Sequence, residues 1–239
     1  MSKIAANLIR VYLNQFDLSG VLNAASLKVE QETPVVTCFS DTGPRRVVGN
    51  YDHNQSLTGL FEPTDDGYDE QLQALLGSTS DLYLTQTFGI TENSIAYDAL
   101  AQLSGLPLSG QAGGAVMRSF EAAGSGGLSR GRILRSATVT GTGNGTGYNA
   151  GATTSGQTYR VMFRLLSFTG TNITMKVQES SDNGAGDAFA DVTGLTSGAL
   201  TAAGIVVVST TAATEAYKRV VISGTITSAT VLVTAGVVS

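Results

Sequence analysis

The chain has little charge for its size. Only 14% of its 239 residues are charged, against about 25% in a typical soluble protein. Hydrophobic residues make up 42%, enough for a substantial core. Much of the remaining surface must be neutral Ser, Thr, Asn and Gly, which suits subunits that pack against copies of themselves. The formal net charge of −5 gives no general attraction to nucleic acid or anionic membranes.

Cysteine, histidine and tryptophan are nearly or wholly missing. With one cysteine, Cys38, no intrachain disulfide can form, and with one histidine, His53, the chain lacks the ligands of a usual zinc site. A Cys38–His53 nucleophile pair has no local signature in its favour. We therefore expect a half-buried, apolar Cys38, a surface His53, and neither a metal nor an enzymatic activity.

Long apolar runs and proline-rich stretches are also absent. No stretch approaches 18 apolar residues and no secretory segment is recognisable, so we expect no membrane anchor and folding in a cytoplasm. Four prolines argue against a proline-rich linker, whereas 29 glycines fit many tight turns.

Two polar motifs invite a ligand interpretation. The glycine pattern GTGNGTG at 141–147 is not followed by a predicted helix, so it fails the context of a dinucleotide site. The stretch SSDNGAGD at 180–187 could form a calcium-stabilised turn, although a plain turn is the preferred interpretation. No cofactor is predicted.

Period-two alternation dominates the chain and predicts a mainly β fold. It is clear at 25–30, 159–165 and 173–178, and short strands separated by turn signals follow to the C-terminus. The segment 95–103 alternates as a strand would, although its alanines also allow a helix; we favour the strand. Such spacing is typical of a β-sandwich.

One helix is predicted, from about Asp66 to Leu76. Acidic residues precede and open it, as helix N-termini favour, and Gly77 ends it. Helix capping explains most of the acidic run at 62–70 better than a cation site does. The apolar stripe expected to pack on the sheet consists of Leu72, Leu75 and Leu76.

The composition of the sequence changes near residue 135. Most charge precedes this point, and a Gly- and Thr-rich segment, 136–158, follows it. We predict two domains, 1–135 and 136–239, the alternative being one domain with a long loop. In the first domain a long Gly- and Pro-containing loop, 38–50, is expected to be functional. Its candidate contact residues are Asp41, Arg45, Arg46, Tyr51 and Asp52.

The order of these motifs resembles the major tail tube proteins of long-tailed, siphovirus-type bacteriophages. The stretches that carry the resemblance are DLSGVLNAASLKVEQE and SDTGPRRVVGNYDHNQSLTGLFEPTDDGYDEQLQALLGSTS, then TVTGTGNGTGYNAGATTSGQTYRVMFRLLSFTGTNITMKVQESSDNG and YKRVVISGTITSATVLVTAGV. The last two resemble an Ig-like domain often appended to these proteins. No single motif is specific; their order carries the resemblance.

The resemblance implies a structural virion protein. It would have a tail-tube-type β-barrel or sandwich flanked by one helix, followed by a second, Ig-like β-sandwich on the tube exterior. Hexameric rings would stack into a hollow tail tube through which double-stranded DNA leaves the capsid. Partners would be other copies and other tail proteins, with assembly in the host bacterial cytoplasm. The 38–50 loop would contact the next ring.

Two other functions fit the same composition. A capsid decoration or tail-tip protein would share the sandwich modules and differ in assembly. A carbohydrate-binding module would need exposed aromatic residues for sugar stacking. The C-terminal part offers few, and most lie at core-like positions: Tyr148, Tyr159, Phe163, Phe168, Phe189 and Tyr217.

Overall fold

The computed structural model describes residues 8–39, 42–49, 51–61, 68–78 and 81–239. These residues are mainly β-strand with one short α-helix, so the mainly β prediction is confirmed. The strands form a large antiparallel sheet, whose longest path of paired strands ends at β13 (Ala190–Leu200) and β2 (Phe16–Asp17). Because these two end strands do not pair in the described part of the chain, the barrel form of the prediction is wrong.

The chain divides into two compact units. The larger unit comprises residues 8–20, Tyr83–Ala99 and Leu128–Val238, and the smaller comprises the described residues of Val21–Leu82 and Leu100–Gly127, with Ser239. The predicted boundary at 135/136 lies inside strand β9 (Ser129–Val139) of the larger unit, so the two divisions do not coincide. The predicted boundary does not separate the two units because β9, the strand that crosses it, is hydrogen-bonded along its length to the C-terminal strand of the larger unit.

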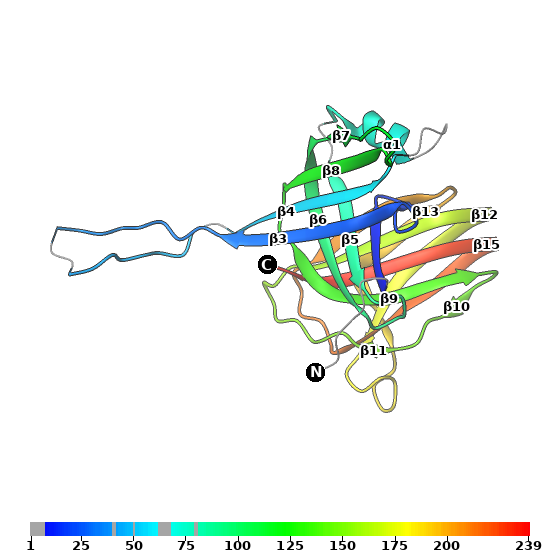
Figure 1. Cartoon of the computed structure of the whole chain (residues 1–239). Coiled ribbons are helices and arrows are strands. Elements are labelled where there is room, and N and C mark those ends of the chain that lie inside the picture. The colour runs from blue at the N-terminus through cyan, green and yellow to red at the C-terminus, as the bar shows by residue number, and fades with distance from the viewer. Residues whose placement is uncertain (1–7, 40–41, 50, 62–67, 79–80) are drawn as a thin grey trace. The chain divides into compact units, whose positions relative to one another are not determined.

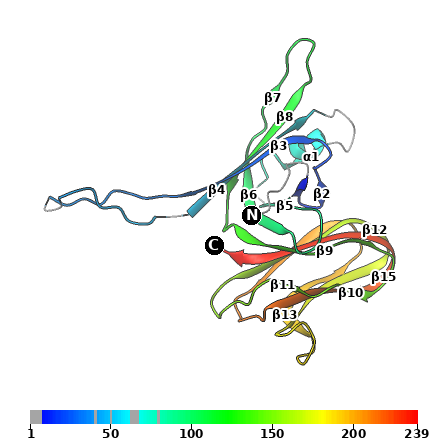
Figure 2. The same ribbon diagram turned by 60° about the horizontal axis from the view of Figure 1, so that its bottom comes forward.

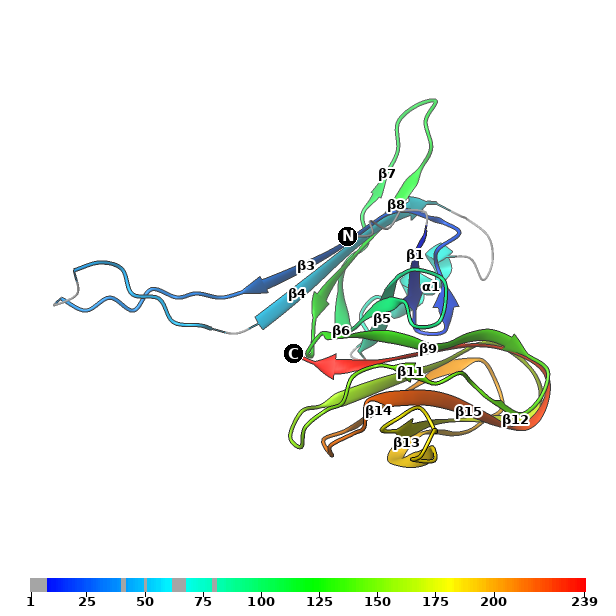
Figure 3. The same cartoon turned by 90° about the horizontal axis from the view of Figure 1, so that it is seen from below.

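Two long strands organise the larger unit. β12 (Tyr159–Ser180) and β15 (Tyr217–Val238) pair along almost their whole length, with bulges between Leu165 and Asn172. The other strands of this part extend them on both sides (Figures 2 and 3), namely β9, β10 (Gly143–Asn144), β11 (Tyr148–Asn149), β13 and β14 (Gly204–Thr210). The result is a sandwich in which the bulges carry each long strand from one layer to the other.

The sandwich core follows the alternation of the sequence. Tyr159, Val161, Phe163 and Leu165 are buried there, facing residues such as Met175 from the second half of β12. The side chains on the opposite face of the first half are buried as well: Arg160, Met162 and Arg164. The first half of β12 is therefore covered on both faces, as central strands of layered β proteins are.

The remaining strands of the larger unit contribute, with β9 and β15, to a second apolar cluster. β1 (Ile9–Leu13) pairs with β2 and with β5 (Leu82–Phe88), and the start of β6 (Ile95–Gly105) pairs with β9. β6 is a strand throughout, which confirms that interpretation of its ambiguous sequence. The cluster consists of Tyr12, Ala96, Ile133 and Leu232.

The smaller unit is built on β3 (Leu22–Gln31), β4 (Tyr51–Leu60) and β8 (Met117–Gly124). β4 lies between β3 and β8, and β8 also pairs with the second half of β6 and with β7 (Leu108–Ser109). Alternate β4 residues are buried, and His53 is one of them, with 2% of its surface exposed. The predicted surface position of His53 is wrong because this residue lies on the inward face of the strand.

The helix α1 (Tyr68–Leu75) also belongs to the smaller unit. Gly77 follows it with φ of 80°, the left-handed conformation that ends helices, as predicted. Leu72 is fully buried and Leu75 half-buried, but Leu76 lies beyond the helix end and is 54% exposed. Leu76 thus falls outside the packed stripe that the sequence predicted. No helix in the described part of the chain has the length and apolarity to cross a bilayer.

Candidate assembly surfaces

Residues 32–39 and 42–49 prolong the β3–β4 hairpin into a narrow projection, which we call the arm (Figure 1). Backbone hydrogen bonds join its two sides. Gly49 N–H donates to the Glu32 carbonyl at 2.7 Å, and Val36 N–H donates to the Arg45 carbonyl at 2.8 Å. The predicted loop is therefore a hydrogen-bonded ribbon in its described part.

Large apolar side chains lie exposed along the arm. Phe39 is fully exposed, Val48 is 74% exposed and Val35 is 54% exposed, and Val36 and Val47 are also open to solvent. Cys38 is exposed too, so the expectation of a half-buried cysteine is wrong. A ribbon without a layer packed on it cannot bury these side chains by itself. Contiguous exposed apolar surface on a soluble protein marks an interaction site.

The predicted contact residues lie in and beside the arm. Arg45 and Arg46 are exposed within it, and Arg46 forms an isolated bridge with Val35. Tyr51 opens β4 and is 47% exposed, and Asp52 follows it, accepting a hydrogen bond from the His53 N–H at 2.7 Å. Asp41 lies outside the described residues. Contact of these residues with a neighbouring ring stays a prediction.

Strand β3 forms a second exposed surface, because it pairs with β4 alone among the described strands. Eight of its ten residues are exposed and the other two are intermediate. The strand carries few charges, and its exposed Lys28 and Glu30 form an ion pair at 2.7 Å. A long strand edge with free backbone donors and acceptors is a template for pairing with another chain.

A buried ionic centre lies inside the larger unit. Asp98 on β6 and Arg164 on β12 are fully buried, with 3.9 Å between Asp98 Oδ1 and Arg164 Nη1. The Thr85 and Thr234 hydroxyls both donate to Asp98 Oδ1. Arg164 Nε and Nη2 donate to two backbone carbonyls, those of Asn14 at 2.7 Å and Tyr83 at 3.1 Å. Five segments of the chain thus meet at one charge pair.

Burial controls the electrostatics of this unit. It raises the pKa of the Asp98 carboxyl, against the opposing effects of Arg164 and the two threonine hydroxyls. Burial lowers the pKa of Arg164 to about 10 and that of Lys218 to about 8. Lys218 Nζ donates to the carbonyls of Gly151, at 3.0 Å, and Glu215, and lies 5.1 Å from the Tyr159 ring centre. These charges are structural, since each is enclosed and hydrogen-bonded.

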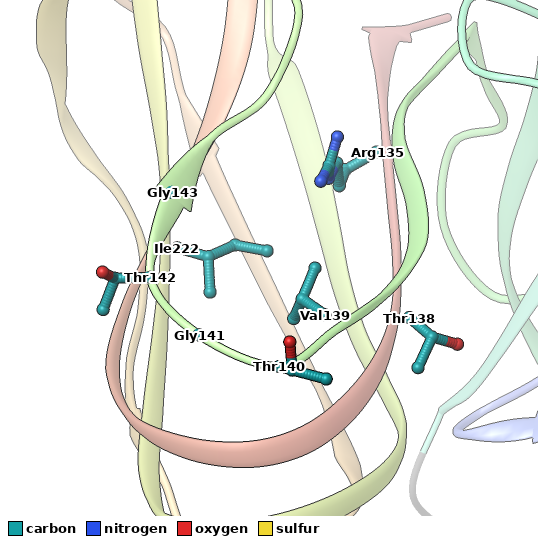
Figure 4. Close-up of a pocket in the computed structure, with 8 residues that line it drawn as sticks. All are labelled: Arg135, Thr138, Val139, Thr140, Gly141, Thr142, Gly143 and Ile222. Carbon is teal, nitrogen blue, oxygen red and sulfur yellow. The ribbon is translucent and has the colours of Figure 1, made fainter.

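The Gly- and Thr-rich segment forms one wall of a pocket of about 360 Å³ (Figure 4). Residues 138–143 curve around the side chains of Val139 and Ile222, with Arg135 beside them. Arg135 is already neutralised by Glu92 at 3.1 Å, and Tyr148 OH donates to the other oxygen of Glu92. The glycine pattern at 141–147 contributes the short strand β10.

The acidic turn at 180–187 is held by its own backbone. Asp182 accepts hydrogen bonds from the N–H groups of Ala185, Gly186 and Asp187, and Asp187 accepts one from the Ser181 N–H. No group of three or more metal-ligating side chains is found among the described residues. The turn is thus explained by its hydrogen bonds.

Sequence reasoning missed the buried ionic centre. Asp98 interrupts an apolar alternation in IAYDALA, and Arg164 does the same in RVMFRLL. A charged residue at an apolar strand position is rarely buried without a partner, so each was a signal. Their pairing across 66 residues of sequence could not be deduced from either pattern.

Comparisons with known proteins give distant similarities only. No protein-family model matches the chain, and no curated protein does. Two solved structures of gene transfer agent particles match 54% of this chain and 98% of theirs: the tail of an empty particle with C6 symmetry, at 19% identity and a TM-score of 0.40, and a native virion, at 18% and 0.41. The SPP1 Dit protein, described as a paradigm of the hub adsorption apparatus in phages that infect Gram-positive bacteria, matches 96% of this chain and 98% of its own at 10% identity and a TM-score of 0.36.

Proposed function

We propose that this protein is a structural subunit of a phage-type tail, whose copies form hexameric rings that stack into a hollow tube. The observation that carries the proposal is the smaller unit's exposed apolar arm, next to a strand with an open edge. Both features leave interactions unsatisfied in one chain that further copies can complete. The order of sequence motifs, which resembles major tail tube proteins, supports the same function.

Ring closure is assigned to the edge of β3. An edge strand of ten residues gains backbone hydrogen bonds when a strand of a neighbouring copy pairs with it. In the proposed ring the partner is another strand of the neighbouring copy, so the two surfaces differ, and such a contact closes when it is repeated around a six-fold axis. The charges on β3 limit uncontrolled pairing with other chains.

Stacking is assigned to the arm. Its valines and Phe39 would become buried against the next ring, while Arg45 and Arg46 would meet acidic groups there. The burial of these apolar side chains would stabilise the contact between rings by about 25 cal/mol for each Å² of apolar surface removed from water. Asp41, Tyr51 and Asp52 complete the proposed contact.

DNA passage agrees with the charge of the chain. A net charge of −5 and only 14 lysines and arginines give few sites at which phosphates could be held. Residues 136–239 are assigned to the tube exterior. Other tail proteins and the transient DNA are the further partners, and the mature location is the virion tail.

Cryo-electron microscopy of the purified full-length protein tests the proposal. The expected result is six-fold rings and stacks of rings. A variant with residues 33–48 replaced by Asn-Gly should form rings that do not stack, because the arm is missing. Shortening the other exposed hairpin, at residues 110–116 between β7 and β8, is the matched control and should leave stacking intact.

The alternatives predict other particles. Discrete small oligomers that never stack at any concentration would favour the tail-tip or capsid decoration function. A folded chain that stays monomeric would contradict assembly altogether. Binding of an oligosaccharide by that monomer would favour the carbohydrate-binding module.

A further inference from the structure

A second pocket of the larger unit, of about 270 Å³, is flanked by two arginines. Arg130 and Arg132 lie two residues apart on β9 and therefore project from the same face of the strand, with their Cα atoms about 6.6 Å apart. Ile95, Gly131 and residues 149–151 complete the lining. All of these residues belong to the larger unit.

Both guanidinium groups are held in place by one hydrogen bond each. Arg130 Nε donates to the Tyr97 hydroxyl at 3.1 Å, and the Tyr97 ring packs edge-on against Phe88 with 5.6 Å between ring centres. Arg132 Nη1 donates to the Asn93 carbonyl at 2.8 Å. A guanidinium has five N–H donors, so most donors of each arginine remain available while its orientation is constrained.

The charge of this pocket is not neutralised within the described residues. Neither Arg130 nor Arg132 has a carboxylate within ion-pair distance there, unlike Arg135 with Glu92 and Arg164 with Asp98. A third cation lies behind the lining, since Lys218 Nζ donates to the Gly151 carbonyl at 3.0 Å. The two arginines thus give the pocket lining a positive charge in a chain whose net charge is negative, whereas Lys218 interacts with Glu179 and Glu215.

We propose that this pocket binds an oxyanion, a phosphate or carboxylate group, between the guanidinium groups of Arg130 and Arg132. Planar guanidinium donors match the oxygen spacing of both groups and can bind them with two parallel hydrogen bonds. The anion could be free or part of another molecule, and the chemistry is the same in both cases. The proposal does not depend on tube assembly, because it concerns one chain.

Isothermal titration calorimetry of the full-length protein tests the site. The probes are inorganic phosphate and citrate, with sodium chloride at matched ionic strength as the blank. The variant R130Q/R132Q should raise the Kd of the bound probe at least about tenfold, since charge-assisted hydrogen bonds are lost. R130K/R132K keeps both charges but not the planar donors, and should bind with intermediate affinity.

The matched control is K28Q/K176Q, which removes the same charge from two exposed ion pairs elsewhere. It should leave the Kd unchanged. Binding of phosphate alone identifies a phosphate site, binding of citrate alone a carboxylate site, and binding of both a general oxyanion site. The proposal is overturned if neither probe binds, or if the control weakens binding as much as R130Q/R132Q does.

Discussion

In most proteins charged side chains are exposed and large apolar side chains are buried. The two units differ in which part of this rule they depart from. The larger unit encloses charged side chains, with Arg164, Lys218 and Asp98 fully buried. The smaller unit exposes large apolar side chains: all such residues in the described chain belong to it, except Leu8 and Ile90. The larger unit therefore satisfies these buried charges internally, whereas the smaller unit leaves apolar surface for another molecule to cover.

The difference matters for how each unit is stabilised. A buried charge is tolerated only when it is paired and hydrogen-bonded, as Arg164 is through two carbonyls and Asp98. An exposed valine costs little in an isolated chain but gains free energy once covered. Substitutions should therefore change folding in the larger unit and assembly in the arm of the smaller unit.

Truncation should have the largest effect. The change of composition at 135 predicts that residues 136–239 are dispensable for tube formation, which requires residues 1–135 to fold without them. The strand pairing predicts the reverse, because a chain ending at Thr140 loses β15, the partner of β9, and also Arg164 and Thr234 beside Asp98. We expect the truncated chain to be unfolded by circular dichroism and size-exclusion chromatography. A soluble, cooperatively unfolding truncated chain would instead support the boundary at 135.

Substitution of Asp98 comes next. Asp98→Ala leaves Arg164 buried without its countercharge, which should cost about 3–5 kcal/mol in the free energy of unfolding. The control Asp191→Ala breaks the exposed ion pair with Lys176 and should cost at most about 1 kcal/mol. Urea unfolding measures both. Similar losses in the two variants would mean that the buried pair does not stabilise the larger unit.

The strands were predictable because their signal is local. Alternation at 159–165 and 173–178 indicated strands, and the structure has both within β12. The helix end at Gly77 was likewise visible, since a helix stop needs only one glycine with positive φ. Leu76 was misassigned because helical periodicity continues past the residue at which the helix ends.

Long-range partners were not predictable. The alternation of β12 indicated one buried face, and only the layers packed on both sides of it decide that Arg160, Met162 and Arg164 are buried too. The change of composition at 135 lies within β9 and so does not coincide with the ends of the compact units, and whether 1–135 and 136–239 are separate domains stays a prediction. The candidate arm was recognisable by its length, but its exposed valines required the structure.

Leucine substitutions in α1 and directly after it test burial inside the smaller unit. Leu72 is fully buried, so Leu72→Ala should cost about 2–5 kcal/mol. Leu76→Ala, four residues later and 54% exposed, should change the free energy of unfolding by less than about 0.5 kcal/mol. Chemical denaturation of both variants measures these changes. Equal losses in the free energy of unfolding would contradict the difference in burial between the two leucines.

Titration of Lys218 should make the free energy of unfolding depend on pH. Burial lowers its pKa to about 8 in the folded chain from 10.5, so between these values the unfolded chain binds more protons and stability rises with pH. The stability of the wild type relative to Lys218→Met should therefore increase from pH 8 to 10.5, by at most about 1.4 kcal/mol per pH unit. Urea unfolding of both proteins across this range is the measurement, and a difference independent of pH would contradict the lowered pKa.

Substitution of exposed residues in the arm should have the smallest effect on the free energy of unfolding. Val48→Ser and Phe39→Ser should change the free energy of unfolding by less than about 0.5 kcal/mol, because both side chains are open to solvent in the single chain. Both should nevertheless weaken the stacking of rings, since they remove apolar surface that stacking would bury. Ile90→Ser, at an exposed apolar residue of the larger unit, is the control and should leave stacking unchanged.

Hydrogen exchange of assembled wild-type protein should show protection across residues 38–50. Rapid exchange there within intact stacks would mean that the arm stays solvent-exposed, and its valines would then need another explanation.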